Sequence, residues 1–322
     1  MGGDQVELDL GRAGSDAGGD RALVVGKGQR IAADALDQML VRFRETIVHE
    51  ESYLSGTELD AELEASGFHE IAADEDLGEI SAVDMIIRVA AVAPAVEVAA
   101  STLVRPRLCP EAPRPLALVS GSRPVRFGAE AKTALIDTGD AVLRLDVRPG
   151  DFTPLDTLFA YPYAKLAEAA HSRAVPLAQN GALADLRRAW RIGLAAEITG
   201  AIEAGLRATI DHVTQRKQFG QPIGAFQAIH HRLAEVAVQL ESIRWLTFKA
   251  AGSGDPVDAA LAAGQAQAAI RQAVYDFHQF HGAMGLTLEH PLHLWTYRLK
   301  ALAGEMGGAS QQFEAATAGT WG

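Results

Sequence analysis

The sequence has 322 residues, a single cysteine and a formal net charge of −12. This length is enough for two or three domains with a substantial core, and the single cysteine, Cys109, excludes an internal disulfide. The acidic balance argues against a nucleic-acid partner, because phosphates require a basic face.

The first 105 residues are predicted to form a helical region. Residues 1–30 are rich in Gly and Asp, which is typical of a loosely ordered arm. Apolar residues between Ala32 and Ile47 recur every three or four positions, as on the buried face of a helix. From Ser81 to Val104 the chain is mostly Ala, Val and Ile around Pro94, which predicts a buried helix that is kinked or broken.

A reduced middle β domain is predicted over residues 106–156. Four short β-type runs in this stretch are separated by Pro and Gly. They are Leu116–Val119, Val125–Phe127, Thr133–Ile136 and Val142–Val147. The sequence Thr138-Gly139-Asp140 lies between the last two runs and predicts a hairpin turn.

Residues 157–322 are predicted to form a C-terminal four-helix bundle. After a connection of partly helical character from Leu158 to Gln179, apolar residues recur every three or four positions from Ala182 to Val213. Three more helical segments follow with short loops between them, which favours antiparallel packing. They run from about Phe226 to Ala251, from Pro256 to Gly282 and from Pro291 to Leu302. Glycine inside a helix costs about 1 kcal/mol against alanine. Three such residues therefore predict close contacts between helices: Gly193, Gly200 and Gly205.

The segment Arg216-Lys217-Gln218-Phe219-Gly220-Gln221-Pro222-Ile223-Gly224-Ala225-Phe226-Gln227 joins the first two bundle helices. Part of it is explained as a helix end, since its cations suit the helix dipole, Gly220 suits a left-handed cap and Pro222 cannot continue the helix. Its aromatic and amide side chains are not explained in this way.

This segment resembles R-x-x-F-G-x-x-I-x-x-x-Q, which the acyl-CoA dehydrogenase family carries between two C-terminal helices. The matching residues are Arg216, Phe219, Gly220, Ile223 and Gln227. A second family segment, Q-x-x-G-G-x-G followed by E-x-P, is similar to Gln279–Gly285 and Glu289–Pro291, with Ala283 in place of the second glycine. The resemblance implies a mainly α fold with a small β domain, in the order helical, β, helical bundle.

The resemblance also implies an FAD-dependent acyl-CoA dehydrogenase, in which a carboxylate removes an α-proton from an acyl thioester while the flavin takes the β-hydride. The family's catalytic glutamate precedes Gly-Thr after the second motif, and an ungapped count places that position at Met306. Some members take the base from the long helix instead, and that position is Trp190 here. Both base positions are thus vacant, although Glu305 is a neighbouring candidate base. Arg191 matches the family's acyl-CoA-site arginine.

A shared cofactor site follows from the same resemblance. Family members hold the flavin ring with a Thr/Ser-rich segment in the β domain, and nothing similar occurs between Leu108 and Asp156. Their bundles lend residues to a neighbouring subunit, where the arginine contacts the FAD diphosphate and the phenylalanine packs near the adenine. The residues carried over to this role are Arg216, Gln218, Phe219, Ile223, Phe226, Gln279, Gly282 and Ala283.

Three hypotheses for function remain open. The first is a base-less subunit of a heteromeric α2β2 acyl-CoA dehydrogenase, whose full-length partner supplies the base and the ring contacts. Shortened subunits of this kind look similar to those of sterol-degrading bacteria, so we expect a steroid-derived CoA thioester as substrate and an electron-transfer flavoprotein or similar acceptor. The second is a self-sufficient homomeric dehydrogenase with Glu305 as its base. The third is a flavin-free structural or regulatory subunit.

Membranes and metals are not expected to take part. No run approaches the roughly 18 uncharged apolar residues of a membrane span, and the N-terminus lacks a basic segment followed by an apolar one. We therefore expect a cytoplasmic chain without a signal peptide. The histidines lack the carboxylate or cysteine neighbours of a metal-ligand cluster.

Overall fold

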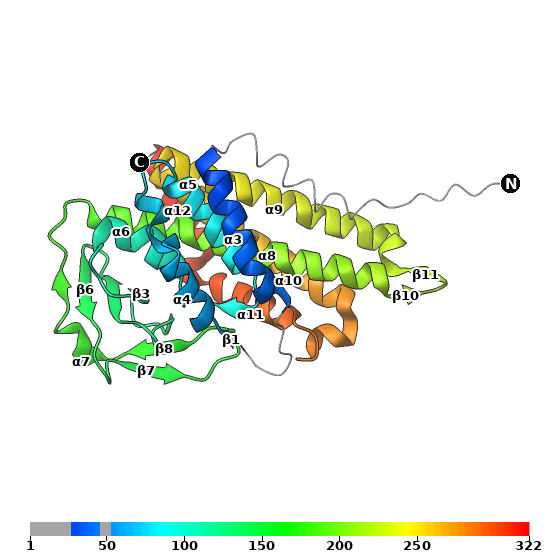
Figure 1. Cartoon of the computed structure of the whole chain (residues 1–322), viewed down its shortest axis with the longest axis horizontal. Coiled ribbons are helices and arrows are strands. Elements are labelled where there is room, and N and C mark those ends of the chain that lie inside the picture. The colour runs from blue at the N-terminus through cyan, green and yellow to red at the C-terminus, as the bar shows by residue number, and fades with distance from the viewer. Residues whose placement is uncertain (1–26, 46–52, 322) are drawn as a thin grey trace.

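The computed structural model describes residues 27–45 and 53–321. It shows an elongated molecule with a β region at one end and long helices that run to the other (Figure 1). Of the arm predicted over residues 1–30, only 27–30 are described, and they begin helix α3 (Lys27–Glu45) instead of a loose segment. Ile47, the last apolar residue of the helix predicted there, lies outside the described residues.

The N-terminal helical region contains a broken helix, which confirms the prediction around Pro94. Helix α4 (Thr57–Ala65), the 3-10 helix η2 (Phe68–Ala73) and helix α5 (Gly78–Ala90) precede strand β2 (Pro94–Ala95), which pairs with β1 (Leu54–Ser55). The chain resumes as the π-helix η3 (Ala100–Val104) and the short helix α6 (Arg105–Leu108). Proline interrupts the helix because it lacks the backbone N–H that a helix interior requires.

The β region consists of a four-stranded and a three-stranded sheet. The first has the order β3 (Leu116–Ser120), β5 (Thr133–Asp137), β6 (Val142–Asp146) and β9 (Val175–Pro176). The second has the order β4 (Val125–Arg126), β8 (Tyr163–Leu166) and β7 (Phe152–Leu155). β5 and β6 are antiparallel across the turn predicted at Thr138-Gly139-Asp140, and β3 pairs with β5 in parallel.

The predicted end of the β domain at residue 156 is too early. Strands β8 and β9, with the short helix α7 (Glu168–His171) between them, lie in the segment that was predicted to be a partly helical connection. These strands are only four and two residues long. They form because they pair with β7, β4 and β6, and such long-range pairing leaves little trace in the local sequence.

The C-terminal region is a helical bundle around one long helix. Its long members are α8 (Ala182–Gln215), α9 (Gln227–Ser253) and α10 (Pro256–His281), followed by α11 (Leu292–Leu302) and α12 (Gly308–Trp321). Short elements join them: β10 (Lys217–Gln218), β11 (Gln221–Pro222), and the 3-10 helices η4 (Ile223–Ala225), η5 (Gly282–Leu286) and η6 (Glu305–Gly307). Asp255 caps α10, because its side chain accepts a 2.8 Å hydrogen bond from the Val257 backbone N–H.

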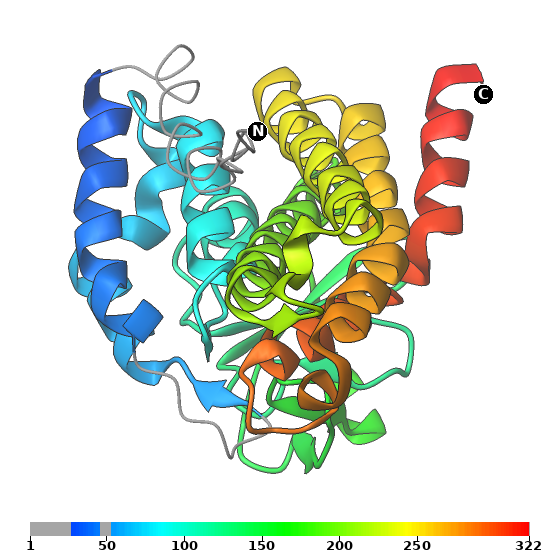
Figure 2. The same ribbon diagram turned by 90° about the vertical axis from the view of Figure 1, so that its right-hand side faces the viewer.

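Helix α8 is the centre of the core, and its glycines lie at close helix contacts, as predicted. A Cβ at Gly200 would collide with the backbone carbonyl of Ile87 in α5, and one at Gly205 would lie 2.6 Å from the Phe277 ring in α10. Figure 2 shows α8 in the middle of the molecule, with α3 and α12 on opposite sides.

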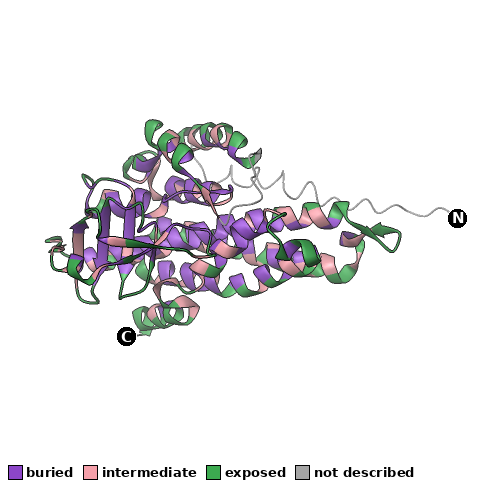
Figure 3. Ribbon diagram, turned by 90° about the horizontal axis from the view of Figure 1, so that it is seen from below, coloured by how far each residue is buried: buried purple, intermediate pink, exposed green. Residues whose placement is uncertain are grey.

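The exposed and buried residues divide along the length of the molecule. Figure 3 shows buried residues in the strands and along the middle of α8, and exposed residues on the β10–β11 hairpin at the far end of the bundle. Cys109 is buried, as expected for a structural thiol. Among the described residues, no helix combines the length and the apolar character needed to cross a membrane.

Candidate functional site

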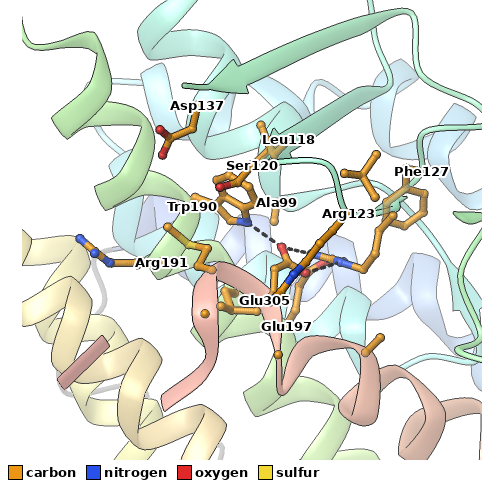
Figure 4. Close-up of a pocket in the computed structure, with 18 of the residues that line it drawn as sticks. Ala99, Leu118, Ser120, Arg123, Phe127, Asp137, Trp190, Arg191, Glu197 and Glu305 are labelled. Atoms are coloured by element: carbon orange, nitrogen blue, oxygen red, sulfur yellow. Dashed lines mark hydrogen bonds and ion pairs between the residues drawn. The ribbon is translucent and has the colours of Figure 1, made fainter. Parts of the chain in front are cut away.

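A cavity of about 810 Å³ lies between the β region and the bundle. Its walls come from η3, β3, β4, α8, α11, η6 and α12, so residues that are distant in sequence meet there. Figure 4 shows this site, which we call the inner cavity, with Trp190, Glu197 and Glu305 close together. Three hydroxyl-bearing residues, Ser120, Thr157 and Tyr163, also line it, from separate segments of the β region.

Arg126 of β4 lies between two carboxylates that also line the inner cavity. Its Nη1 and Nη2 donate to Glu197 of α8 at 3.1 and 2.9 Å. Its Nε and Nη2 donate to Glu305 of η6 at 2.7 and 3.1 Å. Arg126 therefore holds each carboxylate with two hydrogen bonds, a geometry that the planar guanidinium favours.

The Glu305 carboxylate has a third donor from the long helix. The Trp190 indole Nε1 donates a 2.6 Å hydrogen bond to the same Glu305 oxygen that Arg126 Nη2 contacts. Trp190 occupies the position at which some family members carry their base, and here it positions another carboxylate. Met306, the residue counted to the other base position, has a left-handed backbone (φ 51°) and lines the inner cavity.

Burial affects the protonation of the cluster formed by Arg126, Glu197 and Glu305. The Glu197 side chain is 5% exposed, and its burial raises the pKa of that carboxyl although Arg126 acts in the opposite direction. With both glutamates ionised, the three side chains carry one positive and two negative charges.

Further cations line the inner cavity. Arg187 is fixed by Asp137 through hydrogen bonds of 2.7 and 2.9 Å. Arg191, one helical turn later, is oriented by the Gln312 side chain, which accepts a 2.7 Å hydrogen bond from its Nε. Burial and the neighbouring Arg187 lower the pKa of Arg191. In Figure 4 Arg191 lies apart from the two glutamates, so it faces a different part of the site.

The residues of the first motif lie at the opposite end of the bundle. Strands β10 and β11 form a hairpin whose turn contains Phe219 (φ 53°) and Gly220 (φ 82°). The Phe219 side chain is 92% exposed, and its ring contacts only the edge of Phe226 among the described aromatic rings, at 6.1 Å between centroids. Arg216 and Gln218 are also exposed, and in the described chain Arg216 has no acidic partner.

The second motif lies beside the first. Gln279, Gly282 and Ala283 are exposed at the end of α10 and the start of η5. His281, which is buried, stacks on His212 of α8 at 4.4 Å between ring centroids. This stack joins the ends of α8 and α10, and we call residues 216–226 and 279–286 together the bundle tip.

The predicted site residues therefore fall into two groups. Glu305 and Arg191 line the inner cavity, whereas all the residues carried over for FAD binding belong to the bundle tip. Ile223 differs from the others in its group because its side chain packs against the hydrophobic core. This packing alone explains an apolar residue at that position. Metal-ligand clusters of histidine, cysteine and carboxylate were not found in residues 27–45 and 53–321.

Two functional residues of the inner cavity, Arg126 and Glu197, were missed by sequence reasoning. Glu197 lies seven residues after Trp190, so the two share a face of α8 after two helical turns, and this spacing is a signal that could have found it. Arg126 gives no comparable signal, because its partners lie 71 and 179 residues away in sequence.

Comparison with known proteins supports the two-motif resemblance. The sequence model of the acyl-CoA dehydrogenase C-terminal domain matches residues 188–312. These residues are therefore similar to an acyl-CoA dehydrogenase C-terminal domain. The resemblance to this family is thus confirmed, and the family uses FAD.

One curated relative is the acyl-CoA dehydrogenase IpdE2 of Mycobacterium tuberculosis, which is 36% identical over 137 residues. That match covers 42% of this chain and 42% of IpdE2, so the similarity spans less than half of the relative's length. It is confined to part of each protein.

Solved structures extend the likeness to nearly the whole chain. A chain of the ChsE4–ChsE5 complex from Mycobacterium tuberculosis has a TM-score of 0.72 at 21% identity, covering 90% of this chain and 96% of that one. A chain of a variant of the Tcur3481–Tcur3483 steroid ACAD has a TM-score of 0.74 at 20% identity, covering 92% and 98%. The predicted fold, mainly α with a small β region and a C-terminal bundle, is therefore confirmed as the acyl-CoA dehydrogenase fold.

Proposed function

We propose that this chain is a subunit of a heteromeric acyl-CoA dehydrogenase and that its bundle tip completes the FAD diphosphate–adenosine site of a catalytic partner. The observation that carries this proposal is the exposure of the tip residues. Phe219 is 92% exposed on a hairpin, so its ring gains no burial within this chain and is available to a partner. Arg216, beside it, is exposed with no acidic partner among the described residues.

The tip residues suit one wall of a dinucleotide site. Arg216 can donate two parallel hydrogen bonds to a diphosphate, and Phe219 offers an aromatic face to an adenine. Gly282 has φ 60° and open space beside its Cα, so a ligand could approach the backbone there. When bound, the flavin supplies the hydride acceptor, and the bundle tip only holds and orients its nucleotide end.

The catalytic partner would supply what this chain lacks. In this proposal a full-length subunit provides the base and the contacts to the flavin ring, in an α2β2 heterotetramer located in the cytoplasm. The reaction is oxidation of the α,β-bond of an acyl-CoA, with an electron-transfer flavoprotein or similar acceptor. The likeness to chains of the ChsE4–ChsE5 complex and of a steroid ACAD supports a heteromeric assembly and a steroid-derived CoA thioester as substrate.

Replacing Arg216 by Ala in the assembled complex tests the proposal. Loss of charge-assisted hydrogen bonds to the diphosphate should raise the dissociation constant of FAD by about 10- to 100-fold. Unfolding of the subunit should be unaffected, because Arg216 is exposed. Arg207→Ala, an exposed arginine on α8, is the matched control. Unaltered FAD content in the Arg216→Ala complex would instead support the third hypothesis, a flavin-free structural or regulatory subunit.

A second candidate is a self-sufficient dehydrogenase with Glu305 as its base. The position of Glu305 in the inner cavity favours it. However, both oxygens of this carboxylate already accept hydrogen bonds from Arg126 and one also accepts from Trp190, which weakens it as a base. Glu305→Gln separates the two candidates: a homomeric enzyme should lose turnover while keeping its FAD, whereas a subunit that serves its partner should keep turnover in the complex.

A further inference from the structure

Three N–H groups in the inner cavity converge on one carboxylate. Arg126 Nε and Nη2 and Trp190 Nε1 all donate to Glu305, at distances between 2.6 and 3.1 Å. The donors belong to strand β4 and to the N-terminal part of helix α8, which are fixed by the sheet and the core. Glu305 belongs to the short 3-10 helix η6 between α11 and α12. The carboxylate that accepts from these fixed donors therefore comes from a short connecting segment between two helices.

Glu305 is not needed to neutralise Arg126. Glu197, which is nearly inaccessible to solvent, already gives that guanidinium a buried counter-charge with two hydrogen bonds. Glu305 is a second carboxylate on the same cation, and a buried cluster gains little from an excess charge. The Glu305 carboxylate is therefore better explained as the occupant of a binding site than as part of a structural ion pair.

The backbone that follows Glu305 has an unusual conformation. The next three residues, Met306, Gly307 and Gly308, all have positive φ, of 51°, 89° and 76°. A left-handed conformation is costly for methionine, and the two glycines can adopt most other backbone angles. Gln267 Nε2 donates a 2.9 Å hydrogen bond to the Glu305 carbonyl, and Gln312 Nε2 donates a 2.8 Å hydrogen bond to the Met306 carbonyl, so this backbone is held in place. The Glu305 side chain would therefore leave the donors by rotation about its own bonds, without movement of β4 or α8.

The surroundings of the donor set suit a ligand with an apolar body. The cavity of about 810 Å³ is within the usual range for small-molecule sites. Its walls include apolar side chains from β3, from α8 and from the turn after β4: Leu116, Leu118, Leu194 and Phe127. The cations in its lining, Arg123, Arg187, Arg191 and Lys300, would attract an anion.

We propose that the inner cavity binds a carboxylic acid with an apolar body, whose carboxylate replaces that of Glu305 at Arg126 and Trp190. The exchange substitutes one carboxylate for another, so the charge of the buried cluster is unchanged. The apolar body would fill the space beside Leu118 and Phe127. This site is separate from the bundle tip and does not depend on the role proposed for it.

Calorimetric titration of the purified full chain with octanoate tests the proposal. We expect saturable binding of one octanoate per chain, and at least tenfold weaker binding of octan-1-ol, which has the same length but no carboxylate. Glu305→Ala removes the internal competitor and should bind octanoate about tenfold more tightly. Glu314→Ala, an exposed glutamate on α12 outside the cavity lining, should match the wild type.

A second variant keeps the test decisive if Glu305→Ala does not fold. Trp190→Phe retains an aromatic ring of similar shape but loses the Nε1 donor, so octanoate should bind about fivefold more weakly. Octanol binding as tightly as octanoate would overturn the proposal. So would octanoate affinities that are the same in wild type, Glu305→Ala and Trp190→Phe, or the absence of saturable binding in all three.

Discussion

Polar side chains have partners within the chain in the inner cavity, whereas those of the bundle tip are exposed to solvent. In the inner cavity Arg126 is matched to two carboxylates, Trp190 has its acceptor, and Arg187 is fixed by Asp137. At the bundle tip Arg216, Gln218 and Phe219 are exposed to solvent. A group whose partners are internal can be explained within one chain. A large exposed ring beside an exposed arginine is better explained by contact with another molecule, and this contrast underlies the proposed function.

Removing the shared cation should have the largest effect on stability. Arg126→Leu would leave Glu197 and Glu305 in the inner cavity without a counter-charge, and breaking a buried pair in this way costs about 3–5 kcal/mol. Urea denaturation at pH 7 should show this loss. The deficit should shrink at pH 5, because protonation of the stranded carboxylates removes the repulsion. Arg123→Leu, an exposed arginine nearby, should stay close to the wild type. Equal midpoints for both variants would contradict the structural role of the cluster.

The pH dependence of stability should report on the bundle tip. Burial lowers the pKa of His281 to about 4, and the nearby His290 and His212 act in the same direction. The unfolded chain takes up this proton near the usual value of 6.5, whereas the native chain does not. The contribution of His281 to the free energy of unfolding is therefore fully present above pH 6.5. This contribution should fall by about 3 kcal/mol as the pH drops to 4.

Comparing two histidine variants isolates this contribution. His281→Asn should flatten the fall in stability between pH 6.5 and 4, measured by urea denaturation at each pH. His231→Asn, an exposed histidine on α9, should reproduce the wild-type curve. Parallel curves for wild type and His281→Asn would show that the stacked histidines do not resist protonation, and that the tip is less tightly packed than the ring distances indicate.

Phe219→Ala should have the smallest effect on stability and a selective effect on the cofactor. Because Phe219 is 92% exposed, its removal should change the free energy of unfolding by less than about 0.5 kcal/mol. In the assembled complex, loss of stacking on the adenine should weaken FAD binding about tenfold. Trp321→Ala removes an exposed ring at the end of α12, away from the tip, and should leave FAD binding unchanged. Equal FAD affinities in both variants would remove Phe219 from the cofactor site.

Most of the fold could be predicted because its signals are local. The period of α8, the broken helix around Pro94 and the turn at Thr138-Gly139-Asp140 depend on neighbouring residues. Strands β8 and β9 could not be predicted, since two- and four-residue strands depend on partners elsewhere in the chain.

The candidate sites divide in the same way. The motifs located the bundle tip directly, because the residues of each motif are contiguous in sequence. The inner cavity was predicted only in part: Glu305 was a candidate, but the contact with Arg126 joins residues 179 positions apart. Burial and ion pairing at such separations are properties of the folded chain, and no local pattern discloses them.

The most direct test of the central claim is the flavin absorbance of the purified chain, measured alone and after co-expression with a full-length dehydrogenase partner. If the bundle tip serves the cofactor site of another subunit, the chain alone should contain little flavin and show little dehydrogenase activity, and the complex should contain both. A preparation of this chain alone that is yellow and active would contradict the account.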